Sequence, residues 1–359
     1  MRTQDALSIV GTAALVLLAA CGAGDGGAST STAPDGGRAS MGGSSSGRSS
    51  GGSGGSVGQD DGASPGSGAG SDSGSDADAP GSSAGDAGPT PRGDAGGSRD
   101  GGPVSAGCKR GIASNQAPSS ALAPSASSPG VSWWYNWAIS GSGGAAGIEF
   151  VPMVWGSSTA KSALPAGAHY VLGFNEPNFK AQSNLSPQQA AAAWPDIQAH
   201  AKAAGIPLVS PAVNFCGSAS DSSQCTVSTI TDPYTYIKDF LAACTGCEVD
   251  AIAVHWYNCD LPSLKAYIEG NTSTGGGLQG FVQFGKPIWL TEFSCGGGSS
   301  VAQQTAYMKA AVPYLEGNAN IARYSWFSAG PIPNAQLMMS DGSLTDLGKT
   351  YIALPESCR

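Results

Sequence analysis

Short apolar runs recur along the chain from residue 110 to residue 327, separated by helical or Gly- and Pro-rich stretches. Within these runs, apolar residues follow one another directly instead of alternating with polar ones. This pattern is typical of strands that are covered on both faces in a parallel sheet. We expect eight strands, at Arg110–Asn115, Ser132–Ala138, Ile148–Gly156, Tyr170–Glu176, Leu208–Val213, Asp250–Tyr257, Ile288–Phe293 and Ala322–Phe327.

Helix start signals lie between several of these runs. The sequence Ser-Pro-Gln-Gln at 186–189 combines an N-cap, a first-turn proline and a capping-box glutamine, which predicts a helix that ends at Gly205. Further helices are predicted over 234–243, after an Asp-Pro pair, and over 301–315, with Gly317 as its stop. We expect Pro195 to kink or split the first helix and Pro313 to break the last turn of the third.

The number of strands decides between two α/β architectures. Eight strands with helical crossovers in about 250 residues match a (β/α)8 TIM barrel. A doubly wound sheet is the alternative, but it usually needs fewer strands, and no G-x-G-x-x-G sequence follows the first run. We therefore expect an α/β fold, a (β/α)8 barrel formed by a single domain over residues 108–359.

The N-terminus predicts export. Arg2 is followed by the apolar run Ala6–Ala20, which is too short to span a bilayer, since spanning takes roughly 20 residues. The run ends in Leu-Ala-Ala-Cys, which resembles the lipobox of bacterial lipoproteins, where the cysteine is lipidated. We expect a signal peptide over residues 1–21, lipidation at Cys21 and a place at the bacterial cell envelope or surface. Secretion is the alternative if Cys21 only follows an ordinary cleavage site.

Residues 22–107 are rich in Gly, Ser and Asp and contain no aromatic residue. Such a segment buries too little apolar area to offset the entropy of ordering, which predicts a disordered linker. The chain has 17 Lys and Arg against 26 Asp and Glu, a net charge of −9, which excludes an electrostatic nucleic-acid binder. Membrane contact is expected only through the lipid at Cys21, and a monomer is the default state.

Eight cysteines remain when Cys21 is set aside, an even number in an exported domain, which predicts four disulfides. Cys244 and Cys247 form a C-x-x-C sequence, but a zinc site is disfavoured because there is no second such pair. The chain also has three histidines only, none at ligand spacing. From their places in a barrel we expect Cys108–Cys358 at the bottom, Cys216–Cys225 in one loop, Cys259–Cys295 beyond neighbouring strands and, by elimination, Cys244–Cys247.

Active sites of these barrels form at the C-terminal ends of the strands. Two carboxylates, Glu176 and Glu292, end the fourth and seventh predicted strands. Such a pair cleaves glycosidic bonds, one member as proton donor and the other as nucleophile or base, and the two roles need different pKa values. The alternative is that each glutamate is simply a polar residue that closes an apolar strand.

The amino-acid sequences of six predicted strands resemble those of glycoside hydrolase family 128, and the resemblance covers nearly the whole domain from Arg110 to Leu354. The segments that carry the resemblance are Arg-Gly-Ile-Ala at 110–113, Trp-Tyr-Asn-Trp at 134–137, Phe-Val-Pro-Met-Val-Trp-Gly at 150–156, Leu-Gly-Phe-Asn-Glu-Pro at 172–177, Ala-Val-His-Trp-Tyr at 253–257 and Trp-Leu-Thr-Glu-Phe at 289–293. The resemblance implies cleavage of β-1,3-glucans, mostly endo-acting and with retention of configuration.

The resemblance also implies roles for individual residues. Glu176 corresponds to the general acid/base and Glu292 to the nucleophile, while Asn175 holds the 2-hydroxyl of the sugar at the cleavage point. A tryptophan on strand eight, Trp326 here, is implied beneath the scissile sugar. No metal and no other cofactor is expected, because two carboxylates suffice for this chemistry.

Other candidate substrate-binding residues come from their places at strand ends. His255 and Tyr257 share one face of the sixth strand, where either can hydrogen-bond Glu292, although the histidine can instead be a core residue. Trp133, Trp134 and Trp194 are interpreted as packing residues. The remaining candidates are the polar Asn115 and Asn136, and Trp137 and Trp155, which with Trp326 offer stacking surfaces for pyranose rings.

Two other functions fit parts of the same pattern. Another retaining β-glycanase, active on β-1,4 or β-1,6 linkages, needs the same carboxylates but differently shaped loops. A non-catalytic barrel that binds carbohydrate at the cell surface is disfavoured, because Asn175, Glu176 and Glu292 are all present. The expected partner is therefore a β-glucan polysaccharide or oligosaccharide.

Overall fold

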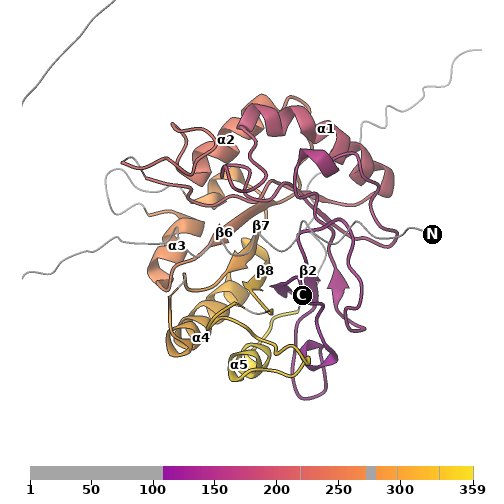
Figure 1. Ribbon diagram of the computed structural model, residues 1–359, viewed down its shortest axis with the longest axis vertical. Helices are drawn as coiled ribbons and strands as arrows, with labels where there is room; N and C mark the ends of the chain where they lie inside the picture. The colour runs from indigo at the N-terminus through magenta and orange to yellow at the C-terminus, as the bar shows by residue number, and fades with distance from the viewer. Residues whose placement is uncertain (1–107, 219, 272–279, 297, 331, 359) are drawn as a thin grey trace, which may run out of the picture. The chain divides into compact units, whose positions relative to one another are not determined.

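The computed structural model describes residues 108–218, 220–271, 280–296, 298–330 and 332–358 (Figure 1). The predicted signal peptide, the predicted lipid site Cys21 and the predicted linker lie outside these residues. Within the described residues, no helix combines the length and the hydropathy needed to cross a bilayer.

All eight predicted strands are present; the first six are shorter than the runs that predicted them, the seventh has the predicted bounds, and the eighth begins one residue earlier. They are β1 (Arg110–Ala113), β2 (Trp133–Tyr135), β3 (Glu149–Phe150), β4 (Val171–Leu172), β5 (Leu208–Val209), β6 (Ile252–Trp256), β7 (Ile288–Phe293) and β8 (Ile321–Phe327). The residues that follow β1 to β5 leave the ladders and form loops at the C-terminal ends of the strands.

The strands follow one another in chain order, and all neighbours are parallel. One sheet has the order β3-β2-β1-β8-β7-β6, and a second pairs β4 with β5. Isolated parallel bridges join the two sheets, between Met153 and Leu172 on one side and from Val209 to Ala251 on the other. The arrangement is that of a (β/α)8 barrel in which two of the eight joins are bridges instead of ladders.

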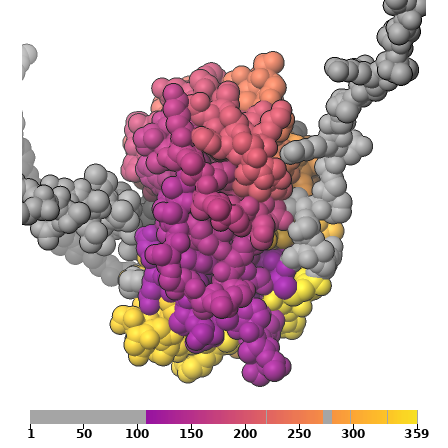
Figure 2. Space-filling view, turned by 90° about the vertical axis from the view of Figure 1, so that its right-hand side faces the viewer, coloured from indigo at the N-terminus to yellow at the C-terminus, as the bar shows by residue number. Residues whose placement is uncertain are grey.

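Helices cover one part of the ring more fully than the other. From β4 onward each strand is followed by an α-helix: α1 (Pro187–Ala204), α2 (Pro233–Ala243), α3 (Leu261–Glu269), α4 (Val301–Gly317) and α5 (Asp346–Ala353). These helices lie outside the strands in Figure 1. The first three crossovers hold only the short 3-10 turns η3 (Ser120–Leu122) and η4 (Ser157–Thr159); a third, η5 (Phe281–Phe284), precedes β7. The purple and magenta segments of this early part form much of the face in Figure 2.

The predicted helix starts are confirmed. Ser186 and Ser300 each cap a helix through a complete capping box, and Asp232 caps α2 by accepting a hydrogen bond from the backbone N–H of Thr235. The sequence prediction missed α3 and α5, whose N-caps are Asp260 and Thr345.

The two internal prolines do not interrupt their helices, so the predicted split at Pro195 and the predicted break at Pro313 are wrong, whereas a kink at Pro195 stays a prediction. The helix α1 continues past Pro195 to Ala204, and α4 continues past Pro313 to Gly317. A proline removes one backbone hydrogen bond from a helix. Burial of Trp194 and Ile197 in α1, and of Val312 and Leu315 in α4, anchors the turns on both sides of each proline.

Large inward side chains fill the barrel interior. The interior cluster contains Ala113, Trp133, Tyr135, Val151, Met153, Tyr170, Leu172, Val209, Ala212, Ala251, Ala253 and Trp289. Near the N-terminal ends of the strands, the guanidinium of Arg323 lies 4.4 Å from the ring centroid of Tyr170 and 4.9 Å from that of Trp289. The same guanidinium donates a hydrogen bond to Glu149 over 2.7 Å, which closes the bottom of the interior.

The predicted packing tryptophans and disulfides are confirmed. Trp133 is buried inside the barrel, whereas Trp134 and Trp194 are buried between the strands and the outer layer. The four disulfides join Cys108 to Cys358, Cys216 to Cys225, Cys244 to Cys247 and Cys259 to Cys295.

The bottom of the barrel is tied to the C-terminal segment. The Arg110 guanidinium donates to the backbone oxygens of Tyr351, Leu354 and Pro355 over 3.0, 2.8 and 2.7 Å. The Cys108–Cys358 disulfide adds a covalent link beside these hydrogen bonds. The first strand and the last helix are therefore held together at the end of the barrel opposite the predicted catalytic carboxylates.

Gly111 leaves the space that the Trp133 indole occupies, because a Cβ atom there would lie 2.3 Å from the ring. Gly111→Ala is therefore expected to lower the free energy of unfolding by about 1–3 kcal/mol, measured by urea denaturation. The matched control is Gly317→Ala at the end of α4, where an added Cβ meets no atom within 4 Å. This control should raise stability by about 0.4–1 kcal/mol. Equal stability of the two variants would contradict this account of the interior.

Candidate active site

The two predicted carboxylates meet at the C-terminal ends of β4 and β7. Glu176 is 1% exposed and Glu292 is 2% exposed. One oxygen of each carboxylate and one ring nitrogen of His255 all lie within 4.8 Å of one another. The chain thus brings together, inside the barrel, acidic groups that are 116 residues apart in the sequence (292 − 176).

His255 on β6 bridges the two carboxylates and is fully buried. Its Nδ1 atom lies 2.9 Å from Oε1 of Glu176, and its Nε2 atom lies 3.5 Å from Oε1 of Glu292. Burial alone lowers the pKa of His255. The negative charge of Glu292 and the hydrogen bond to Glu176 outweigh it, so the net effect raises this pKa. The ring is placed to carry positive charge between two acids.

Glu292 receives three neutral hydrogen-bond donors. Its Oε1 accepts from Trp137 Nε1 over 2.7 Å and from the Tyr135 hydroxyl over 3.1 Å, and its Oε2 accepts from the Tyr257 hydroxyl. Burial is the largest influence on the pKa of Glu292, and together with the charge of Glu176 it gives a net rise. Positive charge on His255 and the bonds from Tyr257 and Trp137 act in the opposite direction and favour the ionised form.

A β-bulge in β7 turns Glu292 into the barrel. Leu290 pairs with Val254 on β6, but the next pair is Glu292 with His255, so Thr291 is an extra residue. Trp289 faces inward, and without the extra residue Glu292 would face outward with Leu290. Bulges near active sites re-aim side chains in this way. Here the bulge sets the carboxylate beside the histidine.

The backbone at Glu176 has a φ of 37°, in the left-handed region that a glutamate seldom adopts. The strain is held by hydrogen bonds, because its N–H donates to Ala212 over 2.8 Å and its carbonyl accepts from Phe179 over 3.0 Å. Oε2 of Glu176 is buried and has no hydrogen-bond partner among the described residues. That oxygen is free to exchange a proton with a bound molecule.

Asn175 lies beside Glu176 with one polar atom unused. Its amide Nδ2 donates to Gln182 over 3.3 Å, and its backbone N–H donates to the carbonyl of Trp155 over 2.9 Å. Within the described part of the chain, its buried Oδ1 has no hydrogen-bond partner. The predicted contact with a sugar hydroxyl is compatible with this arrangement, and Gln182 is an orienting residue that the sequence analysis missed.

The prediction for strand eight is wrong by one residue. Trp326 is fully buried outside the barrel against Phe293 and Tyr351, and its Nε1 donates to the carbonyl of Ala335 over 2.8 Å. It therefore has no free face for a sugar. The partly buried Phe327 faces the site instead, with ring centroids 5.7 Å from Trp137 and 5.4 Å from Tyr257.

The other candidates differ in how they relate to the carboxylates. Trp137 and Trp155 are partly buried and pack against the interior cluster. Asn136 serves its own loop, since its amide donates to the carbonyl of Ser140 and accepts from the N–H of Ala138, each over 3.2 Å. Asn115 is exposed at the end of β1. Tyr257 donates a hydrogen bond to Glu292, as the sequence analysis expected of it or of His255, and His255 lies between the two carboxylates.

Glu176, His255 and Glu292 are also close enough to be considered as metal ligands. Nδ1 of His255 and Oε1 of Glu176 lie 2.9 Å apart, within hydrogen-bond distance. A second group of this kind, Cys108, Glu356 and Cys358, has both sulfurs in a disulfide.

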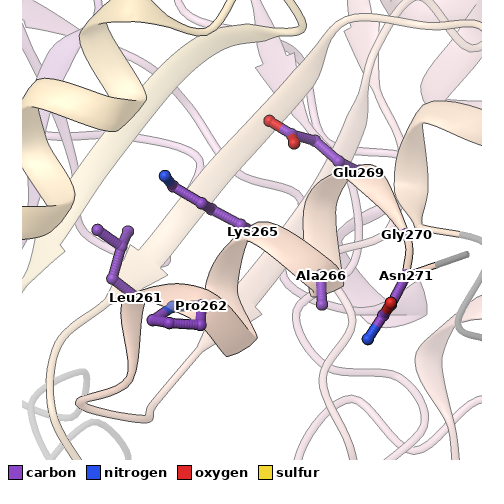
Figure 3. A pocket seen from close by; sticks show the side chains of 7 residues that line it. All are labelled: Leu261, Pro262, Lys265, Ala266, Glu269, Gly270 and Asn271. Atoms are coloured by element: carbon purple, nitrogen blue, oxygen red, sulfur yellow. The ribbon is translucent and has the colours of Figure 1, made fainter. Parts of the chain in front are cut away.

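A cavity of about 320 Å³ lies elsewhere, along α3 (Figure 3). It is lined by Leu261, Pro262, Lys265, Ala266, Glu269, Gly270 and Asn271. Its two charged groups have partners within the protein, since the Lys265 ammonium lies over the Tyr314 ring and Glu269 accepts from the Tyr314 hydroxyl. None of the predicted site residues lines this cavity.

Comparison with known proteins places the chain among glycoside hydrolases. Residues 111–351 match the family described as "Glycosyl hydrolase catalytic core". A family 128 (subgroup II) endo-β-1,3-glucanase structure from Sorangium cellulosum is 40% identical, covers 69% of this chain and 99% of its own, and has a TM-score of 0.54. A subgroup III curdlan-specific exo-β-1,3-glucanase from Blastomyces gilchristii, solved with glucose, is 31% identical, covers 68% and 98%, and has a TM-score of 0.53.

The match to a curated relative from fission yeast covers a smaller share of that relative's length than the matches to the two solved structures do. Alkali-sensitive linkage protein 1 of Schizosaccharomyces pombe (strain 972 / ATCC 24843) is 29% identical over 238 residues, which is 62% of this chain and 40% of that protein. The chain therefore spans less than half of that relative.

Replacing Tyr257 by phenylalanine removes the donor to Oε2 of Glu292. Because the ionised carboxylate loses a donor, we expect the pKa of Glu292 to rise, so that its charge is lost at a higher pH during acidification. The chain has only seven glutamates, and ¹³C-carboxyl NMR of glutamate-labelled protein can follow each titration.

The Glu292 signal is assigned by its absence from Glu292→Gln. Tyr234→Phe is the matched control, because the Tyr234 hydroxyl donates to the carbonyl of Tyr267 and not to the carboxylate. An unchanged or lower pKa of Glu292 in Tyr257→Phe would contradict the assignment of Tyr257 as a stabilising donor.

Proposed function

This chain belongs to glycoside hydrolase family 128, and we propose that it cleaves β-1,3-glucan internally, with retention of configuration, using Glu176 and Glu292. The observation that carries the proposal is the buried pair of carboxylates bridged by His255. The two acids have different surroundings, as two different roles require.

Glu292 has the surroundings of a nucleophile. A carboxylate that attacks carbon must be ionised, and Tyr135, Trp137 and Tyr257 all donate to it. Its burial keeps water from solvating the attacking oxygen.

Glu176 has the surroundings of a general acid/base. One oxygen is hydrogen-bonded to His255, and the other is buried without a partner in the described part of the chain. This second oxygen can hold the proton that the leaving sugar needs and later take a proton from water. A group that changes protonation twice in each cycle benefits from a neighbour such as His255, whose ring can share charge.

The proposed reaction has two steps. Glu292 attacks the anomeric carbon while Glu176 donates its proton to the departing glycosidic oxygen, which leaves a covalent glycosyl ester on Glu292. Glu176 then removes a proton from a water molecule that attacks the same carbon and releases the sugar. The two inversions together retain the configuration.

The distance between the acids supports retention. Retaining glycosidases hold the carboxyl groups about 5–5.5 Å apart, whereas inverting enzymes need roughly 6.5–9.5 Å to admit a water molecule. Oxygens of Glu176 and Glu292 lie within 4.8 Å of each other. This separation of the two acids fits the shorter distance of retaining glycosidases better than the longer distance of inverting ones.

The remaining contacts of the sugar are assigned to neighbours of the carboxylates. Asn175 offers its free Oδ1 to the 2-hydroxyl. Trp137, Trp155 and Phe327 are partly buried aromatic residues by the interior cluster, and we assign stacking against pyranose rings to them in place of Trp326.

The linkage and the mode of cleavage rest on the relatives. The Sorangium and Blastomyces enzymes are named as β-1,3-glucanases, one endo-acting and the other exo-acting. The endo-acting enzyme shares the higher identity, 40% against 31%, which supports internal cleavage here. Cleavage of β-1,4 or β-1,6 bonds, and binding without hydrolysis, are the alternatives that the experiment below separates.

We further propose that residues 108–359 act as an exported domain at the cell envelope. Four disulfides support an oxidising compartment. Lipidation at Cys21 and a flexible linker over 22–107 complete the proposal, since a tethered barrel can reach an insoluble polymer.

The test measures reducing sugar released from soluble β-1,3-, β-1,4- and β-1,6-glucans by the full chain. We expect release from β-1,3-glucan with a ladder of oligosaccharide products, no detectable release by Glu292→Gln, and a loss of about 10²–10⁴-fold in Glu176→Gln. The exposed Glu269 on α3 supplies the matched control, and Glu269→Gln should act like the parent.

Azide distinguishes the two roles. With an aryl glycoside as substrate, azide should give an α-glycosyl azide with Glu292→Ala and a β-glycosyl azide with Glu176→Ala, and the reverse pattern would exchange the assignments. Preferred release from a β-1,4- or β-1,6-glucan would overturn the linkage. Glucan binding without any release by the parent would favour the non-catalytic barrel.

A further inference from the structure

The bulge that aims Glu292 leaves one backbone group without a strand partner. Thr291 has no registered partner on β6 or on β8, because the register shifts on both sides of it. Thr291 is fully buried, so its carbonyl oxygen needs hydrogen-bond donors from within the protein. Two hydroxyls inside the barrel provide them: those of Tyr135 on β2 and Ser325 on β8.

The Tyr135 hydroxyl has two acceptors for a single proton. It lies 3.1 Å from the carbonyl of Thr291 and 3.1 Å from Oε1 of Glu292. Burial raises the pKa of Tyr135 well above its usual value, as does the charge of Glu292, so the hydroxyl keeps its proton. It can therefore donate fully to the carboxylate only if another donor serves the carbonyl.

Ser325 is that other donor. It is fully buried, lies on the inward face of β8 two residues before Phe327, and donates to the carbonyl of Thr291. We propose that Ser325 is a positioning residue for Glu292. By donating to the Thr291 carbonyl, Ser325 fixes the bulge and leaves the Tyr135 hydroxyl available to donate its hydrogen bond to the Glu292 carboxylate. This rests on the proposed role of Glu292 as the nucleophile.

The groups that face Glu292 come from three other strands. They are Tyr135 and Trp137 from β2 and its loop, Glu176 after β4, and His255 and Tyr257 on and just after β6. Ser325 contacts none of these groups through a hydrogen bond of the described residues. Its influence on the carboxylate therefore passes through one backbone oxygen and one tyrosine.

Loss of the serine hydroxyl should redistribute that proton. In Ser325→Ala, Tyr135 is the one side-chain donor to the Thr291 carbonyl that remains among the described residues, so the tyrosine proton moves toward the carbonyl and away from Glu292. We expect Glu292 to titrate at a higher pH than in the parent. For β-1,3-glucan we expect kcat to fall about tenfold, with KM within about twofold of the parent.

The double variant with Tyr135→Phe separates this mechanism from a general loss of packing. Tyr135→Phe alone should raise the pKa of Glu292, because a donor is lost. Adding Ser325→Ala should raise it no further, since no tyrosine proton is left to divert. Ser210→Ala is the matched control, another fully buried serine, whose hydroxyl accepts from the N–H of Ala253. It should lower the melting temperature and leave the Glu292 titration unchanged.

The titration is read by ¹³C-carboxyl NMR of the glutamate-labelled full chain, so it does not depend on activity. A parent that cleaves no glucan would refute the proposed function, while the NMR comparison would still decide the role of Ser325. Three results would overturn that role: an unchanged Glu292 titration in Ser325→Ala, additive shifts in the double variant, or an equal shift in Ser210→Ala.

Discussion

The rest of the structure depends on keeping one carboxylate charged inside the barrel. Glu292 is almost completely buried beside a second buried acid, an arrangement that favours protonation of Glu292. Donors from β2 and its loop, and from the segment at the end of β6, together with a histidine between the acids, oppose that tendency. Because those donors come from different strands, they surround the buried carboxylate only when the ring of strands is assembled.

The two ends of the barrel divide the tasks of stability and chemistry. At the bottom, Arg323 is enclosed by aromatic rings, and Arg110 and the Cys108–Cys358 disulfide fix the C-terminal segment. At the top, Glu176 adopts a left-handed backbone conformation, and β7 carries its bulge. The tightly bonded lower layers allow the upper layer to keep strained and unpaired groups that would otherwise relax.

Much of the fold could be predicted from the sequence because its signals are local. Unbroken apolar runs indicate covered parallel strands, and capping boxes at Ser186 and Ser300 fix helix starts. The predicted breaks at Pro195 and Pro313 were wrong because burial of the residues on both sides of each proline outweighs the loss of one backbone hydrogen bond. No local sequence pattern reveals that burial. The short helices α3 and α5 have capping residues but few turns, so their periodicity is weak.

The site was harder to predict because it depends on which face of each strand turns inward. Inward residues on β2, β6 and β8 carry odd numbers, as in Tyr135, His255 and Ser325, so Phe327 faces the site and Trp326 does not. On β7 the inward series begins at Trp289 and ends at Glu292, which is possible only with an extra residue between them. The sequence motif thus identifies Glu292 as the acid. The orientation of its side chain depends on the bulge, and the bulge can be inferred from sequence only by requiring Glu292 to face inward.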